Sequence, residues 1–325
     1  MMGEQSMMIS PVRFPQIDAG HTIDVASSHE FSHAFSICAN GKYEVVVSDP
    51  RYPSKVEQLG VTFWKGALTQ SPLSRAVALS VRADRLAVAT VGGRLVAGGR
   101  NSPDPCSCKL PGVSRGCMEY MGEGRLLVAA TAGSTNELVL MSVDERNGGA
   151  IRAVASEPLM HAPTSLSTST NRVAVSDASN SVSVYSLEES RKGSGELGYA
   201  LVLTHVIPDC SAVLSVHGDV VLTRENDECG NINVMAMGDQ HAVRMACLSG
   251  CCHAEASQDR VVSIEDCNGA PALVVYRVEE GASGIVRHAP RQLSSPADKA
   301  VSFSVNNIGL RNVITSRASH QLWVM

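Results

Sequence analysis

The chain has 325 residues, of which 44% are hydrophobic, 18% are charged and 4% are aromatic, and its formal net charge is −5. The apolar fraction is enough for a large core, which excludes a disordered chain, and the acidic balance argues against direct nucleic-acid binding. No apolar run has transmembrane length and no secretory signal opens the sequence. We therefore expect an intracellular protein of the cytoplasm or nucleus with no membrane span.

The ten cysteines point to the same compartment. They are scattered singly over most of the chain, and several stand inside apolar alternation, as Cys38 does. In a chain of this length that usage is typical of reduced, buried thiols rather than of a disulfide framework.

A strand pattern repeats along the chain after an N-terminal extension, residues 1–20. We expect residues 21–325 to form one domain in which a unit of four strands recurs. The turns between the first and second strands of the units are expected near Gly41, Asp84, Gly124, Asn171, Asp219, Asp259 and Asn307. Their mean spacing of about 44 residues is the period of four-stranded propeller blades.

The first two strands of each unit differ in composition. First strands are short alternating runs rich in small residues, such as Ala76–Leu79 and Ser165–Thr168. Second strands are continuous apolar runs, such as Leu126–Val128 and Val173–Val175. Small side chains suit a strand beside a narrow central channel, and a continuous apolar run indicates a strand that is buried on both faces.

Third strands carry one large side chain at a nearly fixed distance after the turn. The positions are Met141, Tyr185, Met235, Tyr276 and Trp323. The segments Ser183–Leu187, Val274–Val278 and Gln321–Val324 resemble the third strand of the WD-repeat family, and the resemblance extends over residues 21–325. It implies an all-β, seven-bladed β-propeller with four-stranded blades.

The repeats diverge from the family pattern. The Gly-His pair that usually opens a unit is missing, and no unit contains a Trp-Asp pair. The family's buried Asp-His-Ser-Trp hydrogen-bond network therefore cannot be carried over, and we expect the blades to be held mainly by apolar contact.

The last unit reaches the C-terminus after its third strand. Its fourth strand must come from elsewhere, and Thr22–Val25, upstream of the first unit, is the expected supplier. Such pairing would close the ring and tie both termini down. Fourth strands elsewhere are expected at Ala200–Leu203, Val243–Ala246 and Ile285–Arg287.

Two groups of residues resemble metal sites. His29 to His33 spell His-Glu-x-x-His, the zinc-protease motif, which needs both histidines on one face of a helix. Here the segment runs into an alternating strand, so we interpret it as the start of that strand. The cysteines at 106, 108 and 117 and at 247, 251 and 252 do not form the paired hooks of a structural zinc site. We expect no metal and no cofactor.

Catalytic residues are sparse. The chain has no Gly-x-Ser-x-Gly elbow and no glycine-rich phosphate loop. Enzymatic propellers hold an axial metal, but the expected first strands offer only Glu119 and Glu255, and two carboxylates do not make a metal cage. We predict that the protein is not an enzyme; a propeller hydrolase or lactonase with an axial metal is the alternative.

One face of a propeller gathers the loops between blades and those between second and third strands, which is the usual place for a partner. The residues expected there are Arg51, Tyr52, His161, His205, Arg224, Asp266, Arg291 and Arg317. The resemblance favours a scaffold or adaptor that binds other proteins or peptides as a subunit of a larger intracellular complex. A phosphopeptide or modified-residue reader that uses the arginines is a further alternative.

Overall fold

The computed structural model describes residues 92–99, 105–121, 124–144, 149–191, 197–239, 241–257, 260–267, 270–279 and 284–292, together with the strands named below that lie outside these ranges. All regular elements among the described residues are β-strands, numbered β1 to β29 along the chain. The all-β class predicted from the sequence is confirmed.

The described strands pair into seven antiparallel sheets, numbered here in chain order. Sheet one contains β2 (Gly20–Ser27), β3 (Ser32–Cys38), β4 (Tyr43–Ser48) and β5 (Val56–Val61). Sheet two contains β6 (Ala76–Arg82), β7 (Arg85–Thr90), β8 (Arg94–Gly99) and β9 (Cys106–Lys109). Sheet three contains β10 (Val113–Tyr120), β11 (Arg125–Ala132), β12 (Thr135–Asp144) and β13 (Ala150–Leu159).

The remaining sheets follow the same order. Sheet four contains β14 (Pro163–Thr168), β15 (Arg172–Asp177), β16 (Val182–Arg191) and β17 (Leu197–Ile207). Sheet five contains β18 (Cys210–His217), β19 (Val220–Glu225), β20 (Ile232–Met237) and β21 (Ala242–Leu248). Sheet six contains β22 (Cys251–Ser257), β23 (Arg260–Cys267), β24 (Ala270–Val278) and β25 (Ile285–Arg287), and β26 (Arg291–Gln292) also pairs with β24. Sheet seven contains β27 (Ser302–Val305), β28 (Asn312–Thr315), β29 (Gln321–Val324) and β1 (Val12–Arg13).

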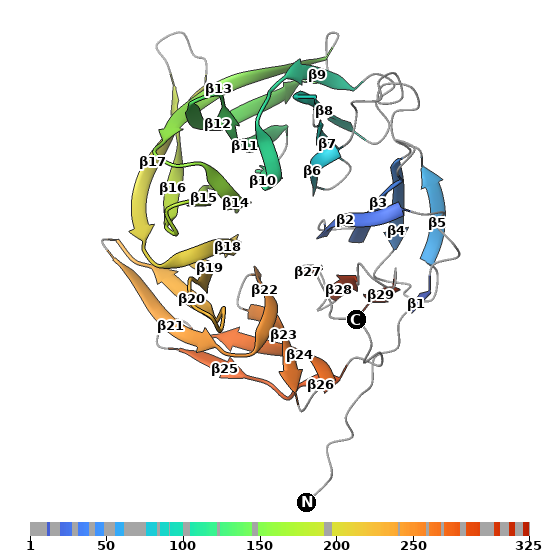
Figure 1. The fold of residues 1–325 in the computed structure, drawn as a ribbon, viewed down its shortest axis with the longest axis vertical. Helices are drawn as coiled ribbons and strands as arrows, with labels where there is room; N and C mark the ends of the chain where they lie inside the picture. The colour runs from blue at the N-terminus through green and yellow to red at the C-terminus, as the bar shows by residue number, and fades with distance from the viewer. Residues whose placement is uncertain are drawn as a thin grey trace, which may run out of the picture.

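The sheets stand around a central opening (Figure 1). The first strand of each sheet lies nearest the opening, and the fourth strand lies at the rim. Each first strand contacts the first strand of the next sheet, and β27 contacts β2. The arrangement packs the broad faces of neighbouring sheets against each other.

The second strands explain the continuous apolar runs of the sequence. In β11, Leu126 and Val128 pack into a cluster shared with sheet two, whereas Leu127 packs into a cluster shared with sheet four. All three side chains are completely buried. Successive side chains of a strand point to opposite faces, so a strand enclosed between two sheets needs apolar residues at every position.

The large side chains predicted on the third strands are buried wherever they are described. Met141, Tyr185, Met235 and Tyr276 are 5 to 8% exposed, and each packs toward the preceding sheet. Burying one such side chain contributes about 1.5 to 3 kcal/mol. The side chain of Trp323 lies outside the described residues.

Side-chain oxygens link the first strands around the opening. Ser80 Oγ accepts the backbone N–H of Tyr120 at 2.8 Å, and Ser215 Oγ accepts that of Ala256 at 3.0 Å. The equivalent bonds in between join Glu119 Oε2 to Thr168 N at 2.7 Å and Ser167 Oγ to Val216 N at 3.1 Å. A first strand is the inner edge of its sheet, so these bonds satisfy backbone donors that pairing leaves free. The small polar residues of the first strands therefore connect the blades as well as fit a narrow space.

Sheet one differs from the sequence prediction. Thr22–Val25 was expected to complete the last unit, but this segment lies in β2, which pairs with β3 as the first strand of sheet one. The prediction is wrong because alternation identifies a strand without giving its place in the sheet. The last sheet instead pairs β29 with β1, where Val12 lies opposite Leu322.

The turn predicted for the first unit is misplaced by one strand for the same reason. Gly41 is outside the described residues, but the strands that precede and follow it in the sequence, β3 and β4, are the second and third of sheet one rather than the first and second. The turns predicted at Gly124, Asn171 and Asp219 lie between the first and second strands of their sheets. Asp84, Asp259 and Asn307 are outside the described residues.

A buried polar network crosses sheet six, where the sequence led us to expect mainly apolar contact. Glu265 is 7% exposed, and its Oε1 accepts hydrogen bonds from Ser263 Oγ at 2.7 Å and from the Tyr276 hydroxyl. Arg287 Nη2 lies 3.1 Å from Glu265 Oε2. Burial, and then Glu265, raises the pKa of the Tyr276 hydroxyl above its ordinary value. The network joins β23, β24 and β25, and of its members only Tyr276 stands at the third-strand position that the sequence marked by a large side chain.

Candidate functional site

The strand pairings bring one set of loops to one edge of the sheets. In sheet four, Pro163 pairs with Asp177, and Val182 pairs with both Ser176 and Ile207. The start of the first strand, the turn between the second and third, and the end of the fourth therefore lie together. We call this edge the loop face; its described segments are residues 92–93, 110–112, 133–134, 160–162, 178–181, 208–209, 226–231 and 249–250.

The structure describes only some of the predicted partner-binding residues. Three lie outside the described residues: Arg51, Tyr52 and Arg317. Two are placed by their backbone alone, in β23 and β26: Asp266 and Arg291. The other three have described side chains: His161, His205 and Arg224. The contacts of these three show whether they are available to a partner.

Arg224 is committed to the protein's own loop. Its Nη1 donates to the backbone carbonyl of Gly230 at 2.9 Å, across the turn 226–231. Gly230 has a φ of 59°, so the turn needs a residue that tolerates the left-handed region.

Arg224 also stands near His253 of sheet six. Burial, and to a smaller extent Arg224, lowers the pKa of His253 to about 4.

The two histidines differ in exposure. His161 is exposed in the connection between sheets three and four. The ring of His205 is engaged, because Nδ1 lies 3.0 Å from Thr204 Oγ1 and Nε2 lies 2.9 Å from the carbonyl oxygen of Gly238. Gly238 belongs to sheet five, so His205 bridges two sheets.

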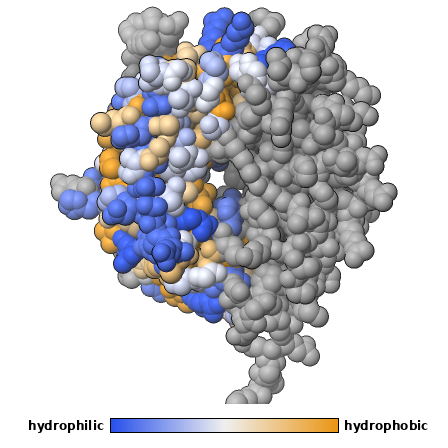
Figure 2. Space-filling view, viewed as in Figure 1, coloured by the Kyte–Doolittle hydropathy of each residue, from blue (hydrophilic) through white to orange (hydrophobic). Residues whose placement is uncertain are grey.

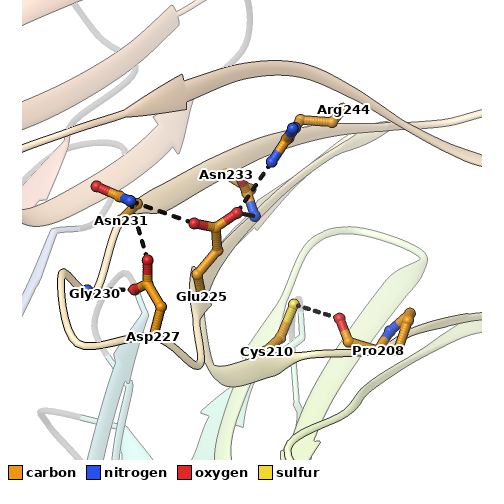
Figure 3. Close-up of polar contacts among 8 residues, drawn as sticks. All are labelled: Pro208, Cys210, Glu225, Asp227, Gly230, Asn231, Asn233 and Arg244. Atoms are coloured by element: carbon orange, nitrogen blue, oxygen red, sulfur yellow. Dashed lines mark hydrogen bonds and ion pairs between the residues drawn. The ribbon is translucent and has the colours of Figure 1, made fainter.

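A polar cluster beside Arg224 was missed by the sequence prediction (Figure 3). Glu225 Oε1 accepts hydrogen bonds from Asn233 Nδ2 and from Arg244 Nη1, both at 3.0 Å. Glu225 Oε2 accepts from Asn231 Nδ2 at 3.4 Å. The carboxylate is thereby held by donors from both β20 and β21 and cannot turn freely.

The next carboxylate fixes the turn itself. Asp227 Oδ1 accepts the backbone N–H of Gly230 at 2.6 Å, and Oδ2 accepts from Asn231 Nδ2 at 3.2 Å (Figure 3). Asn231 therefore links the carboxylates of Glu225 and Asp227. The dense run of Asp, Asn, Glu and Gly at 225–231 was the available signal, since these residues hydrogen-bond to nearby backbone in turns.

The equivalent turn of sheet four is built in the same way. Asp177 Oδ1 accepts from Ser179 N at 2.8 Å, from Ser179 Oγ at 2.6 Å and from Ser181 Oγ at 3.3 Å. Asn180 occupies the left-handed region with a φ of 61°. Two neighbouring turns of the loop face thus each have an aspartate that organises the backbone.

The features that resembled metal sites can be placed in part. His33 lies in strand β3, so it does not stand on the helix that the zinc-protease motif requires, and His29 lies outside the described residues. Over the part of the chain that the structure describes, no group of three or more His, Cys, Asp or Glu is arranged to hold a metal ion.

The cysteines with described side chains are free thiols. Cys106, Cys117, Cys210 and Cys251 are buried, as the sequence predicted. Burial raises the pKa of Cys117 to about 12, which keeps this thiol protonated. Two other thiols, Cys229 and Cys247, are exposed, so the described cysteines are not all part of the core.

The comparisons with known proteins divide between sequence and structure. No protein-family model matches the chain, and no curated protein matches it in sequence. Any likeness to known proteins must therefore be found in the arrangement of the strands.

No helix of the described residues is long and apolar enough to cross a membrane.

Solved structures match the chain over nearly its whole length. The WD40 repeats of RRP9 superpose with a TM-score of 0.66 at 10% identity, covering 98% of each chain. A chain of the mitotic checkpoint complex gives 0.63 at 11%, covering 100% of this chain and 96% of that one. The propeller domain of Myceliophteria thermophila Cps50 (Swd1) gives 0.62 at 11%, covering 97% and 98%. As the sequence resemblance predicted, this chain has the β-propeller fold of WD40-repeat structures.

Proposed function

We propose that this protein is a non-enzymatic scaffold, a subunit of a larger intracellular assembly that binds other proteins or peptides at its loop face. The observation that carries the proposal is the internal order of two loop-face turns. Asp177 holds the turn 178–181 and Asp227 holds the turn 226–231, each through backbone and side-chain donors. A surface that is already ordered loses less conformational entropy when a partner binds.

The frame beneath these turns supports the proposal. We infer that residues 21–325, joined by β1 from the N-terminal extension, form one seven-bladed ring. The contact of β27 with β2 and the pairing of β1 with β29 support this closure. Hydrogen bonds between first strands, such as Ser215 to Ala256, would make the ring a stiff support for its loops.

The charge of the described loops favours a basic partner. Asp177, Asp209, Asp227 and Glu228 lie at the loop face of sheets four and five. Arg224, which a phosphate reader would use there, donates instead to Gly230. A peptide with lysine or arginine side chains therefore fits this part of the surface better than a phosphopeptide does.

The hydrolase alternative has less support. Glu119, one of the two first-strand carboxylates, accepts the backbone N–H of Thr168 and so contributes to the frame. Metal analysis of the purified protein that found stoichiometric calcium or zinc would reverse this preference.

The free thiols among the described cysteines support our placement of the protein in the cytoplasm or nucleus.

Quantitative affinity purification from the native organism tests the proposal. The tagged wild type is compared with the double variant Asp177→Ala/Asp227→Ala, which loosens both turns. The matched control is Asp219→Ala, because Asp219 lies at the opposite edge and is 74% exposed beside Arg172. We expect a stoichiometric partner that the double variant loses and the control keeps. Equal recovery with all three proteins, or no stable partner, contradicts the proposal.

A further inference from the structure

The rim of the ring is formed by the outermost strand of each sheet (Figure 1). Such a strand pairs on one side only, so its other side presents a row of N–H and C=O groups. Proteins usually protect these edges with charged side chains, with proline or by keeping the strand short. The outer strands can therefore be compared by the protection that each one has.

Strand β17 lacks the protection that the other outer strands have. Each of the others contains at least one charged residue: Arg13 in β1, Glu57 in β5, Lys109 in β9, Arg152 and Glu157 in β13, Arg244 in β21 and Arg287 in β25. β17 has the sequence LGYALVLTHVI, with no Asp, Glu, Lys, Arg or Pro in 11 residues. It is also the longest of them.

The apolar side chains of β17 divide between the interior and the solvent. Leu201 and Ile207 are buried against the neighbouring sheets, at 8% and 6% exposure. Val202, Leu203 and Val206 are 38%, 49% and 56% exposed. Figure 2 shows hydrophobic residues along this outer side of the described half of the ring. The register places Leu203 and Val206 on one face of the sheet and Val202 on the other, so this edge strand exposes apolar side chains on both faces.

We propose that β17 is a docking edge for an extended, uncharged segment of a partner protein, which adds to sheet four as a fifth strand. An extended backbone is the structure that satisfies a row of alternating donors and acceptors. A charged side chain placed over Val202, Leu203 or Val206 would be buried without a counter-charge, which is costly. The 11 residues of β17 span about 36 Å, which is long enough for a strand of ordinary length.

This edge is a different surface from the loop face. The segments that form the loop face lie between strands, whereas β17 presents its length around the rim. Substitutions in the turns held by Asp177 and Asp227 leave the edge intact. A failure of this inference is therefore distinguishable from a failure of the proposed scaffold function.

A displayed library of random peptides of about twelve residues tests the docking edge. The full chain is the target, and the variant Leu203→Lys/Val206→Lys, which places two charges on the edge, is the counter-target. The control is Val243→Lys, because Val243 is 54% exposed on β21, a strand that already contains Arg244. Thermal unfolding of both variants checks that they fold.

We expect enriched peptides that lack charged residues and proline over at least five positions, as an added strand requires. Their binding falls at least tenfold in the double variant and is unchanged in Val243→Lys. Bound peptide slows hydrogen exchange of amides between Leu197 and Ile207. Enrichment of charged or helical peptides, or equal binding to the double variant, overturns the proposal. Concentration-dependent dimers of the wild type that the double variant abolishes also overturn it, because the occupant would then be a second copy of the chain.

Discussion

Two interfaces between neighbouring sheets have the same geometry but differ in the polarity of their buried side chains. Between sheets three and four, the core of the contact is an apolar cluster that contains Leu127, Leu138 and Leu140, all completely buried, and charged groups such as the ion pair of Arg125 with Glu189 lie nearer the solvent. Between sheets five and six, an apolar cluster is accompanied by Glu265 with its three polar partners, and His253, whose pKa burial lowers, lies on β22 of sheet six. One repeated architecture therefore has an apolar core at one interface and buried titratable groups beside its core at another.

The apolar interface should show the largest loss on truncation. We expect Leu140→Ala to lower the free energy of unfolding by about 3 kcal/mol, because it removes buried surface and leaves a cavity. Urea denaturation at pH 7 and at pH 5.5 measures the loss, which we expect to be equal at the two values. A much smaller loss would show that sheets three and four are not packed as described.

The polar network should show a smaller but clear loss. We expect Glu265→Ala to cost about 2 kcal/mol, because the hydroxyls of Ser263 and Tyr276 lose a buried acceptor and Arg287 loses its counter-charge. Chemical denaturation measures the change, and Tyr276→Phe, which removes one donor only, serves as the control with a smaller effect. Unchanged stability in Glu265→Ala would mean that the network contributes nothing beyond its apolar surroundings.

Acid should weaken the packing around His253 in sheet six. The pKa of His253 is lowered from 6.5 to about 4, so between these values the unfolded chain binds more protons than the folded one. Stability is then complete above pH 6.5 and is lost as the pH falls toward 4. From pH 6.5 to 5.5 we expect a loss of about 1 kcal/mol that is absent in His253→Gln. An equal dependence of the free energy of unfolding on pH in both proteins would show that His253 does not cause the loss.

The bonds around the central opening should contribute least individually. Ser215→Ala leaves the backbone N–H of Ala256 without its acceptor, and we expect a cost of about 0.5 to 1 kcal/mol. Differential scanning calorimetry compares this variant with Ser249→Ala, whose side chain is exposed in a loop. An equal midpoint for the two variants would argue against a structural role for these bonds.

Much of the fold was predictable because strand burial produces a periodic pattern of apolar residues in the sequence. The apolar run Leu126–Val128 indicated a strand enclosed on both faces, and Tyr185 marked a third strand. The place of Thr22–Val25 was not predictable in the same way. Its alternation suits a first strand or a fourth strand equally, and only the pairing with β3 distinguishes them.

The candidate site was less predictable than the fold. Charge and topology selected Arg224 for the loop face, but they could not show that its guanidinium donates to Gly230. The Glu265 network was also hidden, because Ser263 and Arg287 come from different strands and the repeat does not show which side chains of different strands meet. Contacts of this kind depend on side-chain direction, which a periodic pattern does not contain.

We infer that the loop face is ordered before any partner binds, and amide hydrogen exchange of the free protein measures this order. The N–H groups of Ser179 and Gly230 donate to Asp177 and Asp227. We predict that they exchange at least about tenfold more slowly than unprotected amides, and that Asp177→Ala and Asp227→Ala each abolish the protection of their own turn. Exchange of both amides at the unprotected rate in the wild type would contradict the claim.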